Sequence, residues 1–105
     1  MLENLISEVR SNIRIHHKEL DDEIKNLIET SIEDLITSGI ASSYFDEDKL
    51  RPMLKTAIIT YCKGNFGYDN PEAERFIASY ELQKQKLAIS HHDYVKSESG
   101  NNGTI

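Results

Sequence analysis

The sequence has a single cysteine, Cys62, no tryptophan and only two prolines. One cysteine cannot form an internal disulfide, so nothing in the chain requires an oxidising compartment. No apolar run approaches the ~20 residues that a membrane-spanning helix needs. The N-terminal residues do not follow the pattern of a secretory signal. We therefore expect a protein with no membrane segment that is made in a cytoplasm.

Positive charge is also scarce, because 12 lysines and arginines face 18 acidic residues and the formal net charge is −6. The excess of acid is concentrated in residues 1–40, which contain nine acidic and four basic residues. No basic cluster of the kind that holds phosphates is visible. Sequence-specific binding of DNA or RNA is therefore disfavoured, whereas passage of DNA along a repelling surface is not.

Residue types that carry catalysis or bind metals are present but are not arranged for either task. The adjacent pairs His16-His17 and His91-His92 point apart on a helix or strand, and no further residue completes a usual ligand set. Cys62 lies beside an apolar helix face, which favours a buried thiol. No base, nucleophile and charge stabiliser come together in a recognisable pattern. We predict no enzymatic activity, no metal and no cofactor.

Apolar residues recur at helical spacing in four segments, and no alternating strand pattern persists. The segments span about residues 2–13, 22–38, 50–63 and 71–89, and the third has the broadest apolar face. At 105 residues one domain is expected. The prediction is a small all-α domain of four helices with short loops over residues 1–90, followed by a flexible C-terminal tail over residues 91–105.

Helix boundaries are predicted from the capping residues. Asp21 or Asp22 is expected to cap the second helix and Asp46 or Asp48 the third, since a short carboxylate accepts hydrogen bonds from free backbone N–H groups. The remaining signals are Gly39 as the stop of the second helix, Pro52 in the first turn of the third, Gly64 and Gly67 at its end, and Asn70 as cap of the fourth with Pro71 at its first position.

Two surface features have a functional and an ordinary interpretation. Asp22, Glu29 and Glu33 fall in a narrow arc opposite the apolar side of the second helix, which is either a specific acidic surface or simply a solvated face. Phe66 and Tyr68 lie in a glycine-containing turn, where aromatic rings are costly to expose. Either they fold back over the third and fourth helices, or they dock on another subunit.

The segment formed by residues 54–76 (LKTAIITYCKGNFGYDNPEAERF) resembles the head–tail connector proteins of long-tailed bacteriophages, which are also called adaptor or DNA-packaging proteins. The resemblance extends from residue 1 to about residue 94 and includes the paired aspartates before the second helix. Members of this family are helical subunits without enzymatic activity or cofactor. The resemblance implies a structural protein of the virion neck that is assembled in the host cytoplasm.

The resemblance also implies partners. Such subunits form a homo-oligomeric ring below the portal protein, extend the channel for passing DNA, and dock neck or tail-completion proteins. We expect Asp22, Glu29 and Glu33 to face that channel, where like charge prevents DNA from sticking. We expect Phe66, Tyr68 and Tyr94 to contact neighbouring subunits or partners. The residues alone leave open an alternative, a small acidic helical regulator that binds another protein.

Overall fold

The computed structural model describes residues 2–46, 50–67 and 70–89. Within these ranges the chain forms four α-helices and one short 3₁₀ helix, which confirms the all-α prediction. The domain boundary predicted at residue 90 and the tail over residues 91–105 lie outside the described residues. None of the helices in the described ranges is long and apolar enough to cross a membrane. The elements are α1 (Glu3–Asn12), α2 (Asp21–Thr37), η1 (Ser42–Phe45), α3 (Pro52–Asn65) and α4 (Ala73–Ile89).

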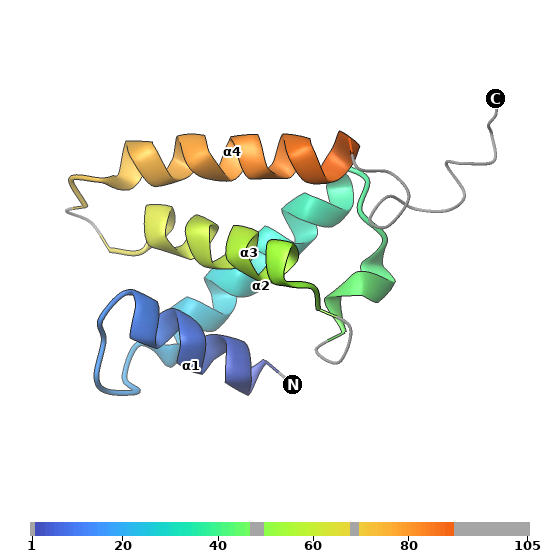
Figure 1. Ribbon diagram of the computed structural model, residues 1–105. Helices are drawn as coiled ribbons and strands as arrows, with labels where there is room; N and C mark the ends of the chain where they lie inside the picture. The colour runs from blue at the N-terminus through green and yellow to red at the C-terminus, as the bar shows by residue number, and fades with distance from the viewer. Residues whose placement is uncertain (1, 47–49, 68–69, 90–105) are drawn as a thin grey trace, which may run out of the picture.

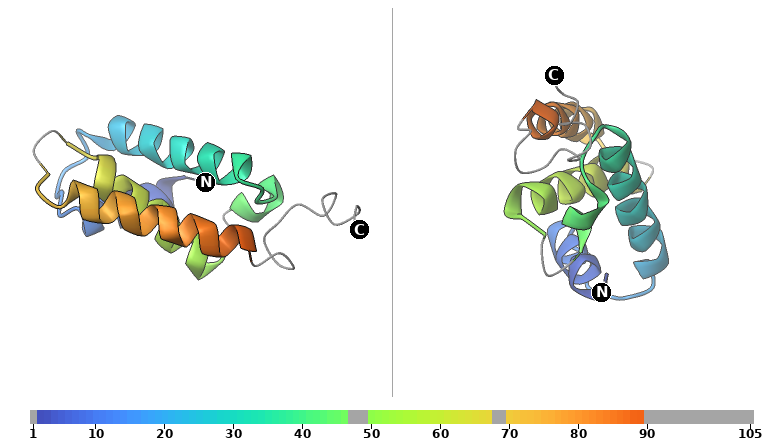
Figure 2. Two further views of the ribbon diagram at one scale, coloured as in Figure 1. Left: turned by 90° about the horizontal axis from the view of Figure 1, so that it is seen from above. Right: turned by 90° about the vertical axis from the view of Figure 1, so that its right-hand side faces the viewer.

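Helix α3 lies at the centre of the fold. It packs against each of the other three α-helices, most extensively against α4. In Figure 1, α4 lies above α3 and runs antiparallel to it, and α1 lies below. The right-hand view of Figure 2 shows α2 along a third side of α3. Leu54, Ala57, Ile58 and Cys62 of α3 are fully buried, as expected for the helix with the broadest apolar face.

The apolar spacing of α2 explains how it packs. Ile24, Ile28 and Leu35 are fully buried, and they lie on one side of the helix at intervals of four and seven residues. The helix ends as predicted at Gly39, which has φ +119°. The N–H of Gly39 donates to the carbonyl of Ile36, and the N–H of Ile40 donates to that of Leu35. This pair of bonds is a Schellman motif, whose left-handed residue is best supplied by glycine.

The prediction that an aspartate caps α2 is wrong. The helix begins at Asp21, and the capping position belongs to Leu20, whose side chain cannot accept a hydrogen bond. The carboxylate of Asp21 is engaged elsewhere, because Nε and Nη2 of Arg10 in α1 donate to its two oxygens at 3.0 and 2.8 Å. A bidentate pair of this kind satisfies the guanidinium fork and joins α1 to α2.

The start of α3 is partly as predicted. Pro52 occupies the first turn, where its missing N–H costs no hydrogen bond. The capping position is Arg51, which makes no side-chain cap, so the prediction of Asp46 as the cap is wrong; Asp48 lies outside the described residues. Asp46 instead follows η1, a turn of 3₁₀ helix whose Phe45 is buried in the core.

Gly64 does not end α3, contrary to the prediction, because the helix continues to Asn65. Gly64 is buried against α4, where a Cβ atom would lie 3.0 Å from Cγ1 of Ile77 and 3.2 Å from its backbone nitrogen. The glycine therefore permits a close approach of the two helices. Gly67, with φ +83°, belongs to the turn after the helix, as predicted.

Asn70 makes a side-chain bond of the kind expected of a cap, but it lies in the turn before α4, which begins only at Ala73. Its Oδ1 accepts a hydrogen bond from the N–H of Glu72 at 3.1 Å. Its Nδ2 donates to the carbonyl of Lys63 at 2.7 Å, which ties the connection back to α3. Pro71 lies in a turn that precedes the helix, so the predicted start is two residues early.

Candidate interaction surfaces

The acidic face of α2 is exposed. Asp22, Glu29 and Glu33 all project to solvent on the side opposite the buried isoleucines. Lys25, four residues before Glu29, is exposed beside them, so the face is predominantly but not uniformly acidic. Exposure in the single chain agrees with both interpretations of this face, and a contact with a partner or with DNA remains a prediction.

A polar cluster between α2 and α4 was missed by the sequence analysis. Its centre is Asp34, whose Oδ2 accepts hydrogen bonds from the hydroxyl of Tyr80 at 2.7 Å and from Nζ of Lys84 at 3.0 Å. Lys84 also pairs with Glu81 at 3.2 Å. The ring of Tyr61 in α3 meets that of Tyr80 edge-on, with 5.0 Å between centroids. The cluster therefore links three helices.

The pKa values of Asp34 and Tyr80 are shifted in the directions that favour a hydrogen bond from the phenol to the carboxylate. Partial burial acts to raise the pKa of Asp34, but hydrogen bonds from Tyr80 and Lys84 outweigh it and hold the pKa below its usual value. Burial, reinforced by the bond to Asp34, raises the pKa of Tyr80. The carboxylate is thus stabilised as an anion and the phenol as a neutral donor. This suits a structural crosslink rather than proton transfer near neutral pH.

One end of the molecule carries a shallow hollow of about 650 Å³, where the end of α1, the end of α3 and the start of α4 come together. These three segment ends lie together at the left of Figure 1. Phe66 and Phe76 are half-buried in the hollow. Phe66 also packs against the core, so it folds back on the helices as one of the two predicted alternatives requires. Tyr68 and Tyr94 lie outside the described residues.

Two cations lie over the ring of Phe76. Nζ of Lys63 lies 5.3 Å from the centroid of the Phe76 ring, and the guanidinium carbon of Arg75 lies 4.8 Å from it. Arg14 lies at the edge of the same hollow. Arg75 forms an ion pair with Glu72, whereas within the described ranges Arg14 and Lys63 have no carboxylate partner. The hollow is therefore locally basic in a chain of net charge −6.

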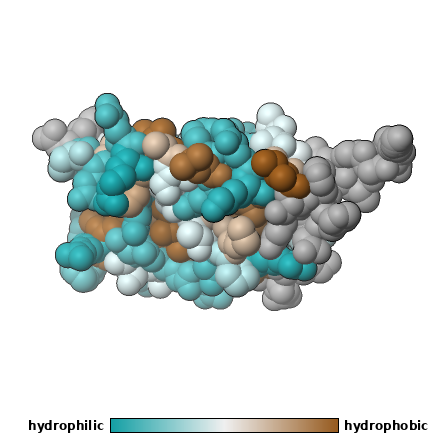
Figure 3. Space-filling view, turned by 45° about the horizontal axis from the view of Figure 1, so that its top comes forward, coloured by the Kyte–Doolittle hydropathy of each residue, from teal (hydrophilic) through white to brown (hydrophobic). Residues whose placement is uncertain are grey.

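Several large apolar side chains of α3 and α4 are exposed. Met53, Leu82 and Ile89 are 49%, 61% and 70% exposed. Next to them a groove of about 220 Å³ runs between the start of α3 and the end of α4. Figure 3 turns α4 toward the viewer and shows hydrophobic atoms as separate clusters among hydrophilic ones. Among the residues that are coloured in this view, the apolar atoms do not form one continuous patch.

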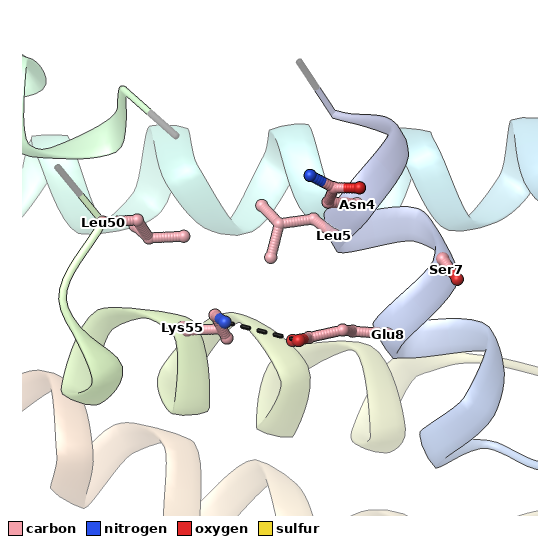
Figure 4. A pocket seen from close by; sticks show the side chains of 6 residues that line it. All are labelled: Asn4, Leu5, Ser7, Glu8, Leu50 and Lys55. Carbon is pink, nitrogen blue, oxygen red and sulfur yellow. Dashed lines mark hydrogen bonds and ion pairs between the residues drawn. The ribbon is translucent and has the colours of Figure 1, made fainter. Parts of the chain in front are cut away.

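A further groove, of about 400 Å³, separates α1 from the segment that enters α3. In Figure 4 the side chains of Leu5 and Leu50 approach each other across it, and Lys55 reaches Glu8. The Lys55–Glu8 ion pair is 3.3 Å long and solvent-exposed. An exposed pair of this kind contributes little to stability, and with two leucines it offers no catalytic constellation.

The remaining candidate residues for chemistry are separate from one another. Cys62 is fully buried, and burial raises the pKa of its thiol to about 12, so the expectation of an inert buried cysteine is confirmed. His16 and His17 are exposed, and His91 and His92 lie outside the described residues. In the part of the chain that the structure describes, no three potential metal ligands come together.

Comparison with known families gives one match that covers most of the chain. The family model described as phage connector protein matches residues 5–94. This range includes α2, α3, α4 and all but the first two residues of α1, together with the acidic face of α2 and the basic hollow. No curated protein and no solved structure matches the chain.

Proposed function

The chain belongs to the phage connector protein family, and from this premise we propose that it is a head–tail connector subunit whose copies form a ring below the portal of a tailed phage. The family is one of structural proteins that interact with phage portal and tail proteins. The observation that carries the proposal is the match over residues 5–94, which covers nearly the whole helical domain. The ring extends the DNA channel, and its far side receives neck or tail-completion proteins.

The acidic face of α2 is the proposed channel wall. This proposal is supported by the exposure of Asp22, Glu29 and Glu33 on one side of α2, because the other side of the helix is packed in the core. DNA carries one negative charge per ~1.7 Å of its axis, so a negative wall lowers its adhesion during passage. Lys25 is placed close enough to moderate this repulsion without reversing it.

Contacts with neighbouring subunits and partner proteins are proposed for aromatic residues and for the C-terminal segment, not for the acidic face. Phe66 is half-buried at the basic hollow, which leaves part of its ring available to a partner. We propose the same role for Tyr68 and Tyr94, and for residues 91–105 as the segment that meets portal or tail protein. A ring closes through contacts between two different patches on adjacent copies, so more than one such surface is required.

The decisive experiment uses a phage from which the gene for this chain has been deleted. We expect DNA-filled heads to accumulate without tails, and purified full-length chain added to these heads to restore tail attachment. Restoration by a chain that lacks residues 91–105 would reject the role of that segment. Normal tailed particles from the deleted phage would reject the connector function as a whole.

Electron cryomicroscopy of the restored particles tests the arrangement of the subunits. A ring below the portal is expected, with Asp22, Glu29 and Glu33 pointing into the channel. A ring with these three residues on its outer rim would reject the proposed channel wall while leaving the connector function in place. A single copy bound beside the portal would reject the ring.

A further inference from the structure

The basic hollow combines features that suit a ligand of one particular kind. Its floor is aromatic and half-buried, formed by Phe66 and Phe76. Its edge carries Arg14 and Lys63, and the neighbouring Glu72 is already neutralised by Arg75. Arg14 and Lys63 have no carboxylate partner among the described residues and lie beside partly exposed rings, and such a surface favours carboxylates placed next to an apolar group.

The backbone at Arg14 gives a second and independent indication. Arg14 has φ +64°, which makes it the only residue other than glycine with positive φ among residues 2–46, 50–67 and 70–89. Its N–H donates to the carbonyl of Ser11 and the N–H of Ile15 donates to that of Arg10, which is the same end motif that Gly39 completes in α2. Glycine adopts this conformation without strain, whereas arginine does not.

Among the described residues, the side chain of Arg14 has no polar contact that would hold this conformation in place of a glycine. The Arg14 side chain is exposed, and it makes no hydrogen bond or ion pair with the described residues. Residues held in sparsely populated backbone conformations concentrate at sites of function, where the side chain is needed for another purpose. The purpose indicated here is a positive charge at the edge of the hollow.

We propose that this hollow binds an acidic peptide segment of a different protein. An apolar side chain of the segment packs against Phe66 and Phe76, and its carboxylates pair with Arg14 and Lys63. This proposal rests on the proposed role of Phe66 as a contact residue and names the chemistry of its partner. Peptide binding needs neither a ring nor a portal, so it is tested separately from the connector function.

Two other occupants fit less well. The acidic face of α2 in a second copy offers carboxylates, but no large apolar side chain is exposed on that helix: within the described residues these are Met53, Ile77, Leu82 and Ile89. Duplex DNA would gain two phosphate contacts at most, against a chain of net charge −6. The acidic peptide alone uses both the rings and the cations.

The test uses the full-length chain and a fluorescein-labelled hexapeptide in which one leucine is flanked by aspartates. A matched peptide has asparagines in place of the aspartates. Fluorescence anisotropy should show binding of the acidic peptide that weakens as salt is raised, and weaker binding of the neutral one. Equal binding of both peptides, or no binding up to about 1 mM, overturns the proposal.

Arg14→Gly separates binding from folding. It should raise the melting temperature because it removes the backbone strain, and should weaken binding by about two- to fivefold, the effect of one screened charge pair. Lys63→Gln should weaken binding similarly, and Lys86→Gln, at the other end of α4, should leave it unchanged. Undiminished binding by Arg14→Gly, or a lower melting temperature, overturns the proposal.

Competition identifies the occupant. A duplex oligonucleotide, added so that its phosphate charges equal the carboxylate charges of the peptide in concentration, should not displace the peptide. An excess of unlabelled chain carrying both Arg14→Gly and Lys63→Gln should not displace it either. This variant keeps the acidic face of α2 but lacks the two cations of the hollow. Displacement by the duplex would assign the hollow to DNA. Displacement by this variant, from which the binding cations are missing, would assign the hollow to a second copy. Either result overturns the proposal.

Discussion

The hydroxyl of Tyr80 in α4 donates a 2.7 Å hydrogen bond to Asp34 in α2, across 46 positions of sequence. Helix α4 otherwise packs chiefly on α3. The bond therefore fixes how α4 is rotated relative to α2, and with it the angle between the acidic face of α2 and the exposed side of α4. Lys84 reinforces the arrangement by donating to the same carboxylate oxygen.

Replacing the donor tests this link directly. Tyr80→Phe keeps the ring, which is almost fully buried and in edge contact with Tyr61, and removes only the hydroxyl. We expect a loss of about 0.5–1.5 kcal/mol in the free energy of unfolding, the usual net value of one intramolecular hydrogen bond. Urea unfolding followed by circular dichroism measures it. A matched control is Tyr61→Phe, which keeps the same pair of rings and removes a hydroxyl that makes no hydrogen bond with the described residues. No loss in Tyr80→Phe would contradict the role given to this bond.

The pH dependence of stability should carry the signature of Asp34. Its pKa in the folded chain lies below the ordinary value of 3.8, so the unfolded chain binds the proton more tightly. The stabilising contribution is therefore complete from about one pH unit above 3.8 and is lost as the pH falls through the lower pKa of the folded state. Asp34→Asn should lower the urea midpoint at pH 7, and its difference from the wild type should shrink between pH 4 and pH 2.

Glu33→Gln is the matched control for that experiment, because Glu33 is the adjacent residue and is exposed. Its urea midpoint should follow the wild type within error at each pH. If Asp34→Asn differs from the wild type by the same amount at pH 2 and pH 7, the difference does not come from ionisation of Asp34. The polar cluster would then act through packing alone.

Gly64 provides a test of the contact between α3 and α4. Alanine is ordinarily favoured over glycine inside a helix by about 1 kcal/mol. Here its Cβ would meet Ile77 and Phe76 at 3.0–3.2 Å, and one of these contacts is with backbone, which cannot rotate away. We expect Gly64→Ala to destabilise the fold by about 1–3 kcal/mol, the range for overpacked sites. Thr56→Ala, at an exposed position of α3, should change stability by less than about 0.5 kcal/mol. A more stable Gly64→Ala variant would show that the helices separate without cost.

The helices themselves are predictable from the sequence because their signals are local. Apolar residues spaced three and four positions apart predict the four helices α1 to α4. The signals at Gly39, Pro52 and Asn70 that mark where helices begin or end act on residues only a few positions away. Gly64 shows where this reasoning fails. A glycine that ends a helix and a glycine that admits a second helix look the same in sequence, and only the position of Ile77 distinguishes them.

The interaction surfaces are less predictable, because they are formed by residues distant in sequence. Aspartate is a residue type that commonly caps helices, yet the carboxylate of Asp21 is hydrogen-bonded to Arg10 instead. The acidic face of α2 lies on a single helix, so the spacing of its residues was enough to predict it. Arg14 and Lys63 of the hollow lie at the ends of different helices, and the sequence did not predict that they come together. The available signal was an arginine at the position after α1 where glycine is usual, which becomes meaningful once the helix end is known.

The thiol of Cys62 should report global unfolding. It is fully buried in α3, and burial raises its pKa to about 12, so both access and thiolate formation are suppressed in the folded chain. At pH 8 we expect a maleimide or disulfide reagent to modify Cys62 only in proportion to the unfolded fraction, with a rate that rises along the urea unfolding curve. The fully unfolded chain in urea, where the thiol is accessible, sets the reference rate. Rapid and complete labelling of a chain that keeps its helical circular dichroism would show that α3 opens locally, and α3 would then not be the rigid centre of the fold.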